Sequence, residues 1–305
     1  MPRSALVTGA FGFVGRHVAR AAADAGYLVT GIGHGSWGRA EWREWGIADW
    51  HAADVTLDAL VSHGGEPAVI FHCAGSGSVA FSMAHPAQDF DRTVGTTRDV
   101  LEYVRLHHPA ARLVLPSSAG VYGDVSALPI AVGSAGNPAS PYGLHKRMAE
   151  DLVRSYGRHF GVAGAIVRLF SIYGPGLRKQ LLWDACLKLS RGEAGFGGTG
   201  DETRDWLHVE DAAALMVTLA GHAAPSVPVV NGASGTGTPI RAIVGQIAAA
   251  LPGAPAPAFS GHVRPGDPLH YVADIADARA LGWTPRHDLT AGIAGYVDWF
   301  RADAS

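Results

Sequence analysis

The first 170 residues of the chain alternate short apolar runs with longer segments in which apolar residues recur at helical spacing. The apolar runs predict strands over residues 5–7, 27–32, 69–73, 112–116 and 165–170, and a further short strand just before Asp54. The longer segments predict helices over residues 14–25, 87–107 and 142–160. Because strands that alternate with helices form parallel sheets covered on both faces, the expected fold is α/β with a doubly wound parallel sheet.

After about Ser171 the alternation loosens, and glycine and proline interrupt the pattern more often. Helices are predicted over residues 181–190 and 240–251, and a late strand over 227–231 is expected to return to the main sheet. The pattern therefore predicts a larger domain and a smaller C-terminal lobe that interleave in sequence. The larger domain covers residues 1–170 plus about 205–235, and the smaller lobe covers 171–204 and 236–305.

A glycine-rich turn joins the first predicted strand to the first predicted helix, where the sequence runs from Thr8 to Gly15 with the spacing Gly-x-x-Gly-x-x-Gly. Gly9 permits the tight turn, Gly12 lets the backbone approach a pyrophosphate, and Gly15 lets the helix pack close to the strand. The helix N-terminus then offers free N–H groups to the phosphates. This position at the first strand–helix junction predicts a dinucleotide site formed by Gly9, Phe11, Gly12, Phe13, Val14 and Gly15.

The end of the second strand leaves the choice between NAD and NADP open. NAD-binding folds usually carry an acidic residue there for the ribose 2′-hydroxyl, but this strand ends in Gly31-Ile32-Gly33-His34-Gly35. His34 or Arg39 could meet a 2′-phosphate, or the segment could be a surface turn in which His34 is incidental. Asp54 and Val55 are expected to cap the adenine edge.

Tyr142 and Lys146 lie four residues apart on a predicted helix, which puts them on one face about 6 Å apart along its axis. The lysine cation is expected to lower the pKa of the tyrosine, so that the phenol can exchange a proton with a hydroxyl while a nicotinamide exchanges hydride. Ser118 closes the fourth of the long strands and can hold the same oxygen. These three residues are the predicted catalytic group.

Composition and charge limit the kinds of partner that the protein is expected to bind. The formal charge of −3 is spread along the chain without a basic run, so nucleic acid is not an expected partner. No apolar run reaches 18 residues, so no membrane span is expected. Cys73 and Cys186 stand apart and are interpreted as reduced thiols of a cytoplasmic protein. No pair of histidines has the spacing and third ligand of a metal site, so none is predicted.

These motifs together resemble the extended short-chain dehydrogenase/reductase family, and within it the NAD-dependent sugar epimerase/dehydratase group, which has the Rossmann fold. The segments that carry the resemblance are 8–15, 117–123, 140–146, 168–175, 204–211, 264–267 and 281–285.

The resemblance implies an enzyme with a nucleotide-linked sugar as substrate. It implies that Tyr142 is the acid/base, that Lys146 orients the ribose, and that Ser118 binds the reacting oxygen. The implied cofactor is NAD or NADP, and Ala74 and Gly75 are also expected to contact it. The implied substrate ligands are Ser76, Ser118, Ser171, Arg204 and Arg264, the two arginines clamping the diphosphate.

Departures from the family's pattern limit the reaction. Ala119 and Gly120 stand where dehydratases carry an acidic pair, where sugar-acid decarboxylases carry a glutamate and where fucose-synthase-like enzymes carry a cysteine. Ser171 replaces the usual asparagine after Arg-x-Phe, and Arg92 replaces another asparagine.

Three functions remain open at this point. The leading one is a nucleotide-sugar 4-epimerase, which oxidises and re-reduces C4 of a hexose. The alternative is a nucleotide 4-keto-6-deoxysugar reductase that uses NADPH, and a distant alternative is a non-catalytic nucleotide-binding protein. By the resemblance, the helices over 87–107 and 142–160 pair in a homodimer.

Overall fold

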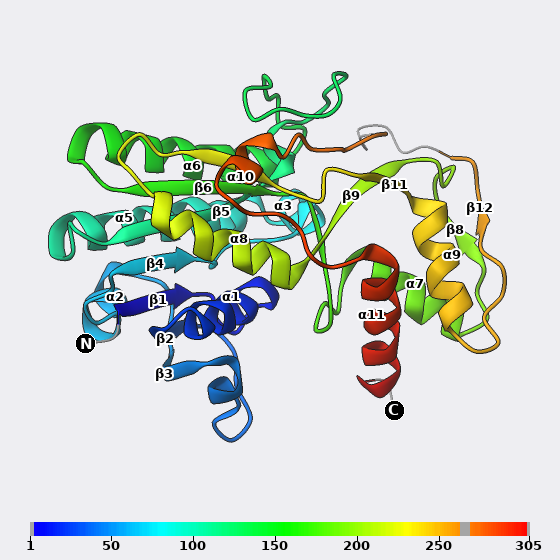
Figure 1. Cartoon of the computed structure of the whole chain (residues 1–305), viewed down its shortest axis with the longest axis horizontal. Coiled ribbons are helices and arrows are strands. Elements are labelled where there is room, and N and C mark those ends of the chain that lie inside the picture. The colour runs from blue at the N-terminus through cyan, green and yellow to red at the C-terminus, as the bar shows by residue number, and fades with distance from the viewer. Residues whose placement is uncertain (1–2, 263–268, 304–305) are drawn as a thin grey trace.

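The computed structural model describes residues 3–262 and 269–303. A seven-stranded parallel sheet forms the centre of the larger domain, in the order β10-β6-β5-β4-β1-β2-β3 (Figure 1). The doubly wound parallel sheet expected from the sequence is confirmed. Its strands are β1 (Arg3–Thr8), β2 (Tyr27–Gly33), β3 (Ile47–Ala52), β4 (Val69–His72), β5 (Arg112–Ser118), β6 (Gly164–Leu169) and β10 (Val229–Gly232).

Two layers of helices cover this sheet and create two separate cores. Successive residues of β1 show the division, because Val7 packs into one core and Leu6 into the other. On one face α1 (Phe13–Asp24) and α8 (Val209–His222) pack against each other and the sheet. On the other lie α2 (Leu57–His63), α5 (Thr96–His107) and α6 (Pro141–Phe160). Every residue of β4 and β6 is buried, as a sheet covered on both faces requires.

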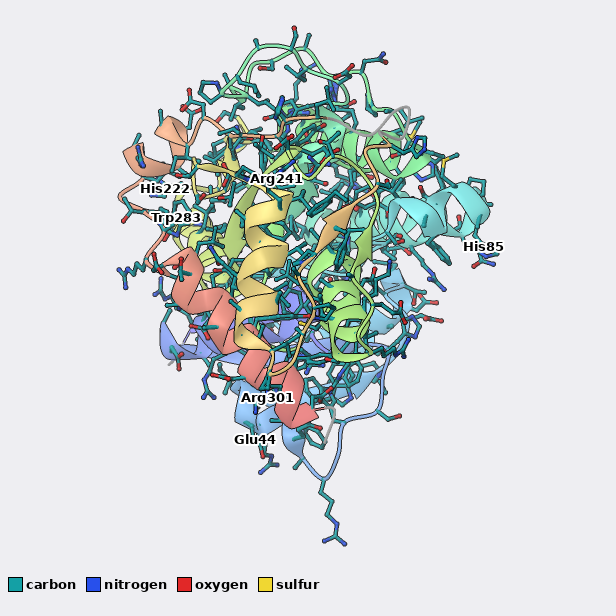
Figure 2. All side chains as sticks on the ribbon, turned by 90° about the vertical axis from the view of Figure 1, so that its right-hand side faces the viewer. Glu44, His85, His222, Arg241, Trp283 and Arg301 are labelled. Atoms are coloured by element: carbon teal, nitrogen blue, oxygen red, sulfur yellow. The ribbon has the colours of Figure 1, made fainter. Side chains whose placement is uncertain are left out.

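The smaller lobe has a core of its own, formed by three helices beside short strands. Figure 2 views the molecule from this side, with these helices toward the reader. The helices are α7 (Gln180–Ser190), α9 (Ile240–Ala250) and α11 (Leu289–Asp303). The strands are β7 (Ser171–Tyr173), β9 (Thr203–His208) and β11 (Gly237–Pro239) in one sheet and β8 (Gly195–Phe196) and β12 (Ala258–Phe259) in another.

The segment expected to be one helix over 87–107 is interrupted, so that expectation was wrong. After α3 (Val79–Ala84) come α4 (Pro86–Phe90), a π-helical turn (Asp91–Gly95) and only then α5. At the start of α5, the Thr97 hydroxyl donates to the Thr93 carbonyl oxygen of this turn at 2.6 Å, and the Thr96 hydroxyl donates to the Arg92 carbonyl oxygen at 2.7 Å. Such side-chain bonds to the preceding turn compete with the regular helical pattern.

The remaining predicted elements are present, with ends within two residues of the expected ones. Two short segments, Glu41–Trp45 and Ala119–Val121, form 3-10 helices. The helix α10 (Ala276–Ala280) packs beside β10. β10 pairs with β6, while β9 belongs to the smaller sheet. Across the described ranges, no helix has the length and apolarity to cross a membrane.

A buried ion pair fastens α6 to the sheet. The guanidinium of Arg168 on β6 donates twice to the Glu150 carboxylate on α6, at 2.9 and 2.8 Å, and the Ser117 hydroxyl on β5 donates to it at 2.6 Å. Arg154 adds a fourth bond at 3.0 Å. Burial alone raises the pKa of the Glu150 carboxyl, but the hydrogen bonds and charge of Arg168 outweigh it and leave that pKa below its ordinary value.

Replacing Glu150 by Gln should destabilise the fold by about 3–5 kcal/mol at pH 7, because Arg168 would stay buried without its counter-charge. The lowered pKa means that the wild-type carboxylate stabilises the fold above its ordinary pKa, and this contribution is lost as pH falls through the folded pKa. Urea unfolding at pH 7 and at successively lower pH would measure both effects. The matched control is Asp151→Asn, at an exposed ion pair, where about 1 kcal/mol or less is expected. Equal losses in the two variants would contradict the role given to Glu150.

Candidate active site

A cleft of about 1270 Å³ opens at the carboxyl ends of the central strands, between the larger domain and the smaller lobe. Open α/β sheets bind ligands at this edge, where successive loops diverge to opposite faces. The larger domain contributes Gly12, Phe13, Val14, Gly75, Ser76, Ser118, Tyr142 and Lys146 to the walls. The smaller lobe contributes Ser171, Lys179, Lys188, Phe196 and Arg204.

The glycine turn is packed so closely that side chains cannot be accommodated. A Cβ on Gly15 would collide with the Gly9 carbonyl oxygen, and one on Gly9 would lie 2.7 Å from the Ala74 backbone nitrogen. Gly9 also has a φ of 66°, which favours glycine. Gly12 begins α1 without any side-chain cap, so the first N–H groups of the helix face the cleft unblocked. This arrangement fits a dinucleotide pyrophosphate, with Gly12, Phe13 and Val14 against it.

The end of β2 borders a second hollow of about 400 Å³, separate from the main cleft. It is lined by residues 33–36 and 52–54. Here His34 Nε2 lies 2.7 Å from a carboxylate oxygen of Asp54. The β2 end has no acidic residue of its own, as the sequence indicated, but β3 brings one to the same place. Asp54 could therefore accept a hydrogen bond from a ribose hydroxyl, and its charge would disfavour a 2′-phosphate.

Aromatic side chains close the outer side of this region. The rings of Phe11 and Trp37 meet edge to face at 4.9 Å, and the Arg16 guanidinium lies over both. Val55, predicted at the adenine edge, is buried. His34 and Asp54 thus line a hollow that is separate from the cleft on which the predicted catalytic residues lie.

The predicted catalytic residues gather on the cleft. Tyr142 opens α6, where Ser140 caps the helix by accepting from Gly143 N at 3.2 Å. The Tyr142 N–H donates to the Ser82 hydroxyl at 3.0 Å. Ser118 ends β5, and its hydroxyl oxygen accepts from Gly120 N at 3.1 Å. The Lys146 ammonium donates to the Pro116 carbonyl oxygen at 3.2 Å, which directs it beneath the same strand end.

The protonation of this group differs from the sequence-based expectation. Burial raises the pKa of the Tyr142 phenol, and the opposing effect comes from a hydrogen bond with Ser118, not from Lys146. The prediction that Lys146 lowers this pKa was therefore wrong for the chain itself. Burial lowers the pKa of Lys146 to about 8. Burial thus shifts both the Tyr142 phenol and the Lys146 ammonium toward their neutral forms.

The floor of the cleft follows β4, where Ala74 and Gly75 were expected to contact the cofactor. A Cβ on Gly75 would lie 3.6 Å from the Lys146 amine, so the loop passes directly beside the catalytic lysine. Ser76 N donates to the hydroxyl of Thr93 at 3.4 Å. Thr93 belongs to the π-helical turn, so this interruption supports the floor, in keeping with the frequent occurrence of such turns at functional sites.

Two of the expected substrate ligands, Ser171 and Arg204, lie on the wall formed by the smaller lobe. Ser171 begins β7, and Arg204 on β9 donates from Nη1 to the Thr203 carbonyl oxygen at 2.9 Å. Arg264 lies outside the described residues. Asp205, which sequence reasoning missed, is buried and accepts from Ser234 N and Oγ, Gly235 N and Ala273 N at 2.6–3.1 Å. Those bonds fix the strand that carries Arg204.

Two further groups near the cleft were not predicted. His145 Nδ1 lies 2.6 Å from Asp89 in a buried pair that ties α6 to α4. The only sequence signal for it was a histidine immediately before Lys146. Lys179 lies at the start of α7 with its amine on the cleft, and it is one of only three lysines in the chain.

A histidine cluster lies where α8 meets the segment before α11. Donor atoms of His208, Glu210 and His287 lie within 4.8 Å of one another. The two imidazole rings are stacked at 4.0 Å with 20° between their planes. Because imidazole nitrogens bind metals in the plane of the ring, rings stacked in this way do not converge on one ion. His287 instead contacts Glu210 at 3.2 Å and Asp211 at 3.1 Å. The absence of a metal site stays a prediction.

The fold and the cleft together define an NAD-dependent enzyme with a glycine turn, a Ser-Tyr-Lys group and a cleft for an extended substrate. Residues 5–231 match the NAD dependent epimerase/dehydratase family, and the chain belongs to this family. The family assignment made from the motifs is confirmed.

Known proteins resemble the chain over its whole length. The UDP-glucose 4-epimerase of Mycolicibacterium smegmatis is 33% identical over 322 residues, covering 97% of this chain and 98% of that protein. The structure of UDP-glucose 4-epimerase with UDP-glucose from Thermotoga maritima has a TM-score of 0.88 at 25% identity, covering 99% of this chain and all of the other. MoeE5 in complex with UDP-glucose and NAD has a TM-score of 0.85 at 26% identity, with the same coverage.

Replacing Gly15 by Ala should weaken dinucleotide binding at least tenfold and destabilise the fold by about 1–3 kcal/mol, because the added methyl group forces α1 away from the turn. Calorimetric titration with NAD and thermal unfolding would measure the two effects. Gly245→Ala on α9 is the matched control, since a Cβ there meets no atom within 4 Å. Unchanged NAD affinity in Gly15→Ala would contradict the proposed cradle.

Proposed function

We propose that the chain is a nucleotide-sugar 4-epimerase acting on a UDP-linked hexose. The observation that carries the proposal is the composition of the reacting end of the cleft. Ser118, Tyr142 and Lys146 border it, and the next two residues after β5, Ala119 and Gly120, carry no acid or base. A Cβ on Gly120 would lie 3.4 Å from the Ser118 hydroxyl and 3.5 Å from the Tyr142 ring, so any functional side chain there would have reached the substrate.

The substrate class is supported by the relatives. The curated relative from Mycolicibacterium smegmatis is a UDP-glucose 4-epimerase, and both solved structures described above hold UDP-glucose. In this chain Phe196, Lys188 and Arg204 line the cleft on the side of the smaller lobe. This lining suits a base beside Phe196, a diphosphate beside Arg204 and a sugar beside Tyr142.

The chain's own residues would divide the reaction as follows. NAD held on the glycine turn supplies a reversible hydride acceptor for C4. Tyr142 removes the proton of the C4 hydroxyl and later returns it to the C4 oxygen, while Ser118 hydrogen-bonds that oxygen throughout. Lys146 would hold the ribose of the cofactor by a hydrogen bond, from its place beneath the end of β5. Gly75 and Gly120 leave room for the oxidised sugar to turn its other face.

The reductase alternative has one observation in its favour, because β2 ends in Gly33-His34-Gly35 without an acidic residue of its own. A protonated His34 would attract a 2′-phosphate. Asp54 opposes this, since its carboxylate contacts His34 and borders the same hollow. The family's dependence on NAD also supports the epimerase.

The deciding experiment measures bound cofactor and turnover together. The purified protein is denatured and the released dinucleotide identified by mass spectrometry, and interconversion of UDP-glucose and UDP-galactose is assayed without added cofactor. Near-stoichiometric NAD and interconversion support the epimerase. An empty protein that prefers NADPH and turns over only a 4-keto sugar would establish the reductase instead. Tyr142→Phe should lower turnover at least a hundredfold while NAD stays bound.

The proposal extends to a homodimer formed through α3, α4 and α6. These neighbouring elements carry exposed apolar side chains, namely Val79, Met83, Phe90, Leu144 and Met148. Met83 is 64% exposed, and large exposed apolar patches mark interaction surfaces. A second copy placed on this face would bury the whole group.

The double substitution Leu144→Glu and Met148→Glu should convert the dimer to a monomer, because it places two charges in the interface. Light scattering coupled to size-exclusion chromatography measures the mass. Val61→Glu, at an exposed apolar position on α2, is the matched control and should leave the mass of the dimer unchanged. A wild-type monomer would overturn the interface.

A further inference from the structure

A buried carboxylate is attached to the helix that carries the predicted catalytic pair. Asp89 on α4 is fully buried, and one of its carboxylate oxygens lies 2.6 Å from Nδ1 of His145 on α6. The other oxygen is also buried, and within residues 3–262 and 269–303 it has no hydrogen-bond partner. On α6, His145 follows Tyr142 by three residues and directly precedes Lys146. A carboxylate with a single hydrogen-bond partner is thus held beside the turn of helix that carries both groups.

Packing around the pair fixes the position of the carboxylate. Both α3 and α4 pack against α6. The Phe90 ring meets the His145 imidazole edge to face, with 5.4 Å between the centroids and 88° between the planes. Arg92, in the π-helical turn that follows α4, lies over the Phe81 ring at 4.7 Å and forms no ion pair with Asp89. The partner that holds Asp89 is therefore an imidazole and not a guanidinium.

The negative charge of Asp89 acts on both members of the catalytic pair. A negative charge favours the protonated form of a neighbouring group, so it raises the pKa of an ammonium and of a phenol alike. Burial lowers the pKa of Lys146 to about 8, and the charge of Asp89 opposes that shift. Burial raises the pKa of Tyr142, and the charge of Asp89 adds to that shift. Asp89 thus favours an ammonium at Lys146 and a neutral phenol at Tyr142.

The other titratable groups that face Lys146 do not supply it with a free negative charge. Burial raises the pKa of the Cys73 thiol to about 12, so the thiol is neutral where the lysine titrates. Burial lowers the pKa of His72 to about 3, so this imidazole is neutral as well. Glu150 is ionised, but it accepts two hydrogen bonds from the Arg168 guanidinium, which balances its charge.

We propose that Asp89, held by His145, is a positioning residue that supplies the buried counter-charge of Lys146 and keeps the lysine an ammonium beside a neutral Tyr142. Its consequence for turnover rests on the proposed 4-epimerase function. An ammonium forms stronger hydrogen bonds to ribose hydroxyls than a neutral amine does, because the charge assists the donor. The same negative charge sets the pH at which Tyr142 ionises and can remove a proton from the sugar.

The test follows the titration of Lys146 directly, by NMR of the NAD-loaded protein labelled with ¹³C-lysine. The chain has only three lysines, so Lys179 and Lys188 serve as internal references. Asp89→Asn keeps the shape of the side chain and removes its charge. It should lower the pKa of Lys146 by about half to one pH unit and leave the two references unchanged. Asp91→Asn is the matched control, because it removes the same charge from an exposed position two residues away and should change none of the three.

The sign of the change separates the electrostatic role from a merely structural one. If Asp89→Asn only loosened the packing, water would reach Lys146, relieve its burial and raise its pKa toward the ordinary value. A raised or unchanged pKa of Lys146 in Asp89→Asn therefore overturns the proposal.

Two variants of His145 give a second comparison, which decides the question even if Asp89→Asn does not fold. His145→Asn keeps a donor close to the position of Nδ1 and should retain the wild-type pKa of Lys146. His145→Leu leaves the buried carboxylate without a donor, which favours its protonation, and should lower the pKa of Lys146 as Asp89→Asn does. A wild-type pKa of Lys146 in His145→Leu would overturn the proposal.

Turnover tests the consequence for Tyr142. In Asp89→Asn the acidic limb of kcat against pH should move to lower pH, because the phenol ionises more readily without the neighbouring negative charge. A limb that stays in place overturns the effect assigned to Tyr142. Failure of the wild type to epimerise UDP-glucose would refute the 4-epimerase, while the titration of Lys146 still decides the role of Asp89.

Discussion

The buried ion pair between Glu150 and Arg168 holds the catalytic helix on the sheet. Tyr142 and Lys146 lie on α6, Ser118 ends β5, and Arg168 lies on β6, so their relative positions depend on how α6 lies across these two strands. Glu150 accepts from Ser117 and Arg168 simultaneously and therefore ties the helix to both strands. Ser117 directly precedes Ser118 on β5, and Glu150 follows Lys146 by about one turn of α6. A shift of α6 would separate the phenol from the serine hydroxyl.

Much of this architecture could be predicted from the sequence, for identifiable reasons. Strands such as β4 and β6 are apolar throughout because both faces are covered, and the glycine turn has a spacing that few other structures need. The π-helical turn could not be predicted, because one additional residue per turn hardly disturbs the apolar pattern of the segment 87–107. The hydroxyls of Thr96 and Thr97 bond to carbonyl oxygens of this turn, a competition with the regular helical pattern that apolar spacing does not reveal.

Residue type and spacing led to the side chains that the structure gathers on the cleft, whereas features that depend on the environment could not be predicted. Tyr142, Lys146 and Ser118 come together as their spacing indicated. The pKa of Tyr142 depends on burial, which a sequence does not record, and it is raised instead of lowered. Asp54 reaches His34 because β2 and β3 are parallel neighbours, a pairing that only the fold reveals. Lys179 belongs to no spacing pattern at all.

The interleaving of the two units limits how they can move. The chain leaves the larger domain after β6, returns for α8 and β10, and then leaves again for α9, so several segments cross the boundary (Figure 1). Asp211 on α8 adds a further attachment, since it accepts from the backbone of Arg286 and His287 at 3.0 Å. A lobe attached at many points has no single hinge about which it can swing. We therefore expect discrimination among ligands to depend on the shape of a cleft that is already formed, more than on closure around the bound molecule.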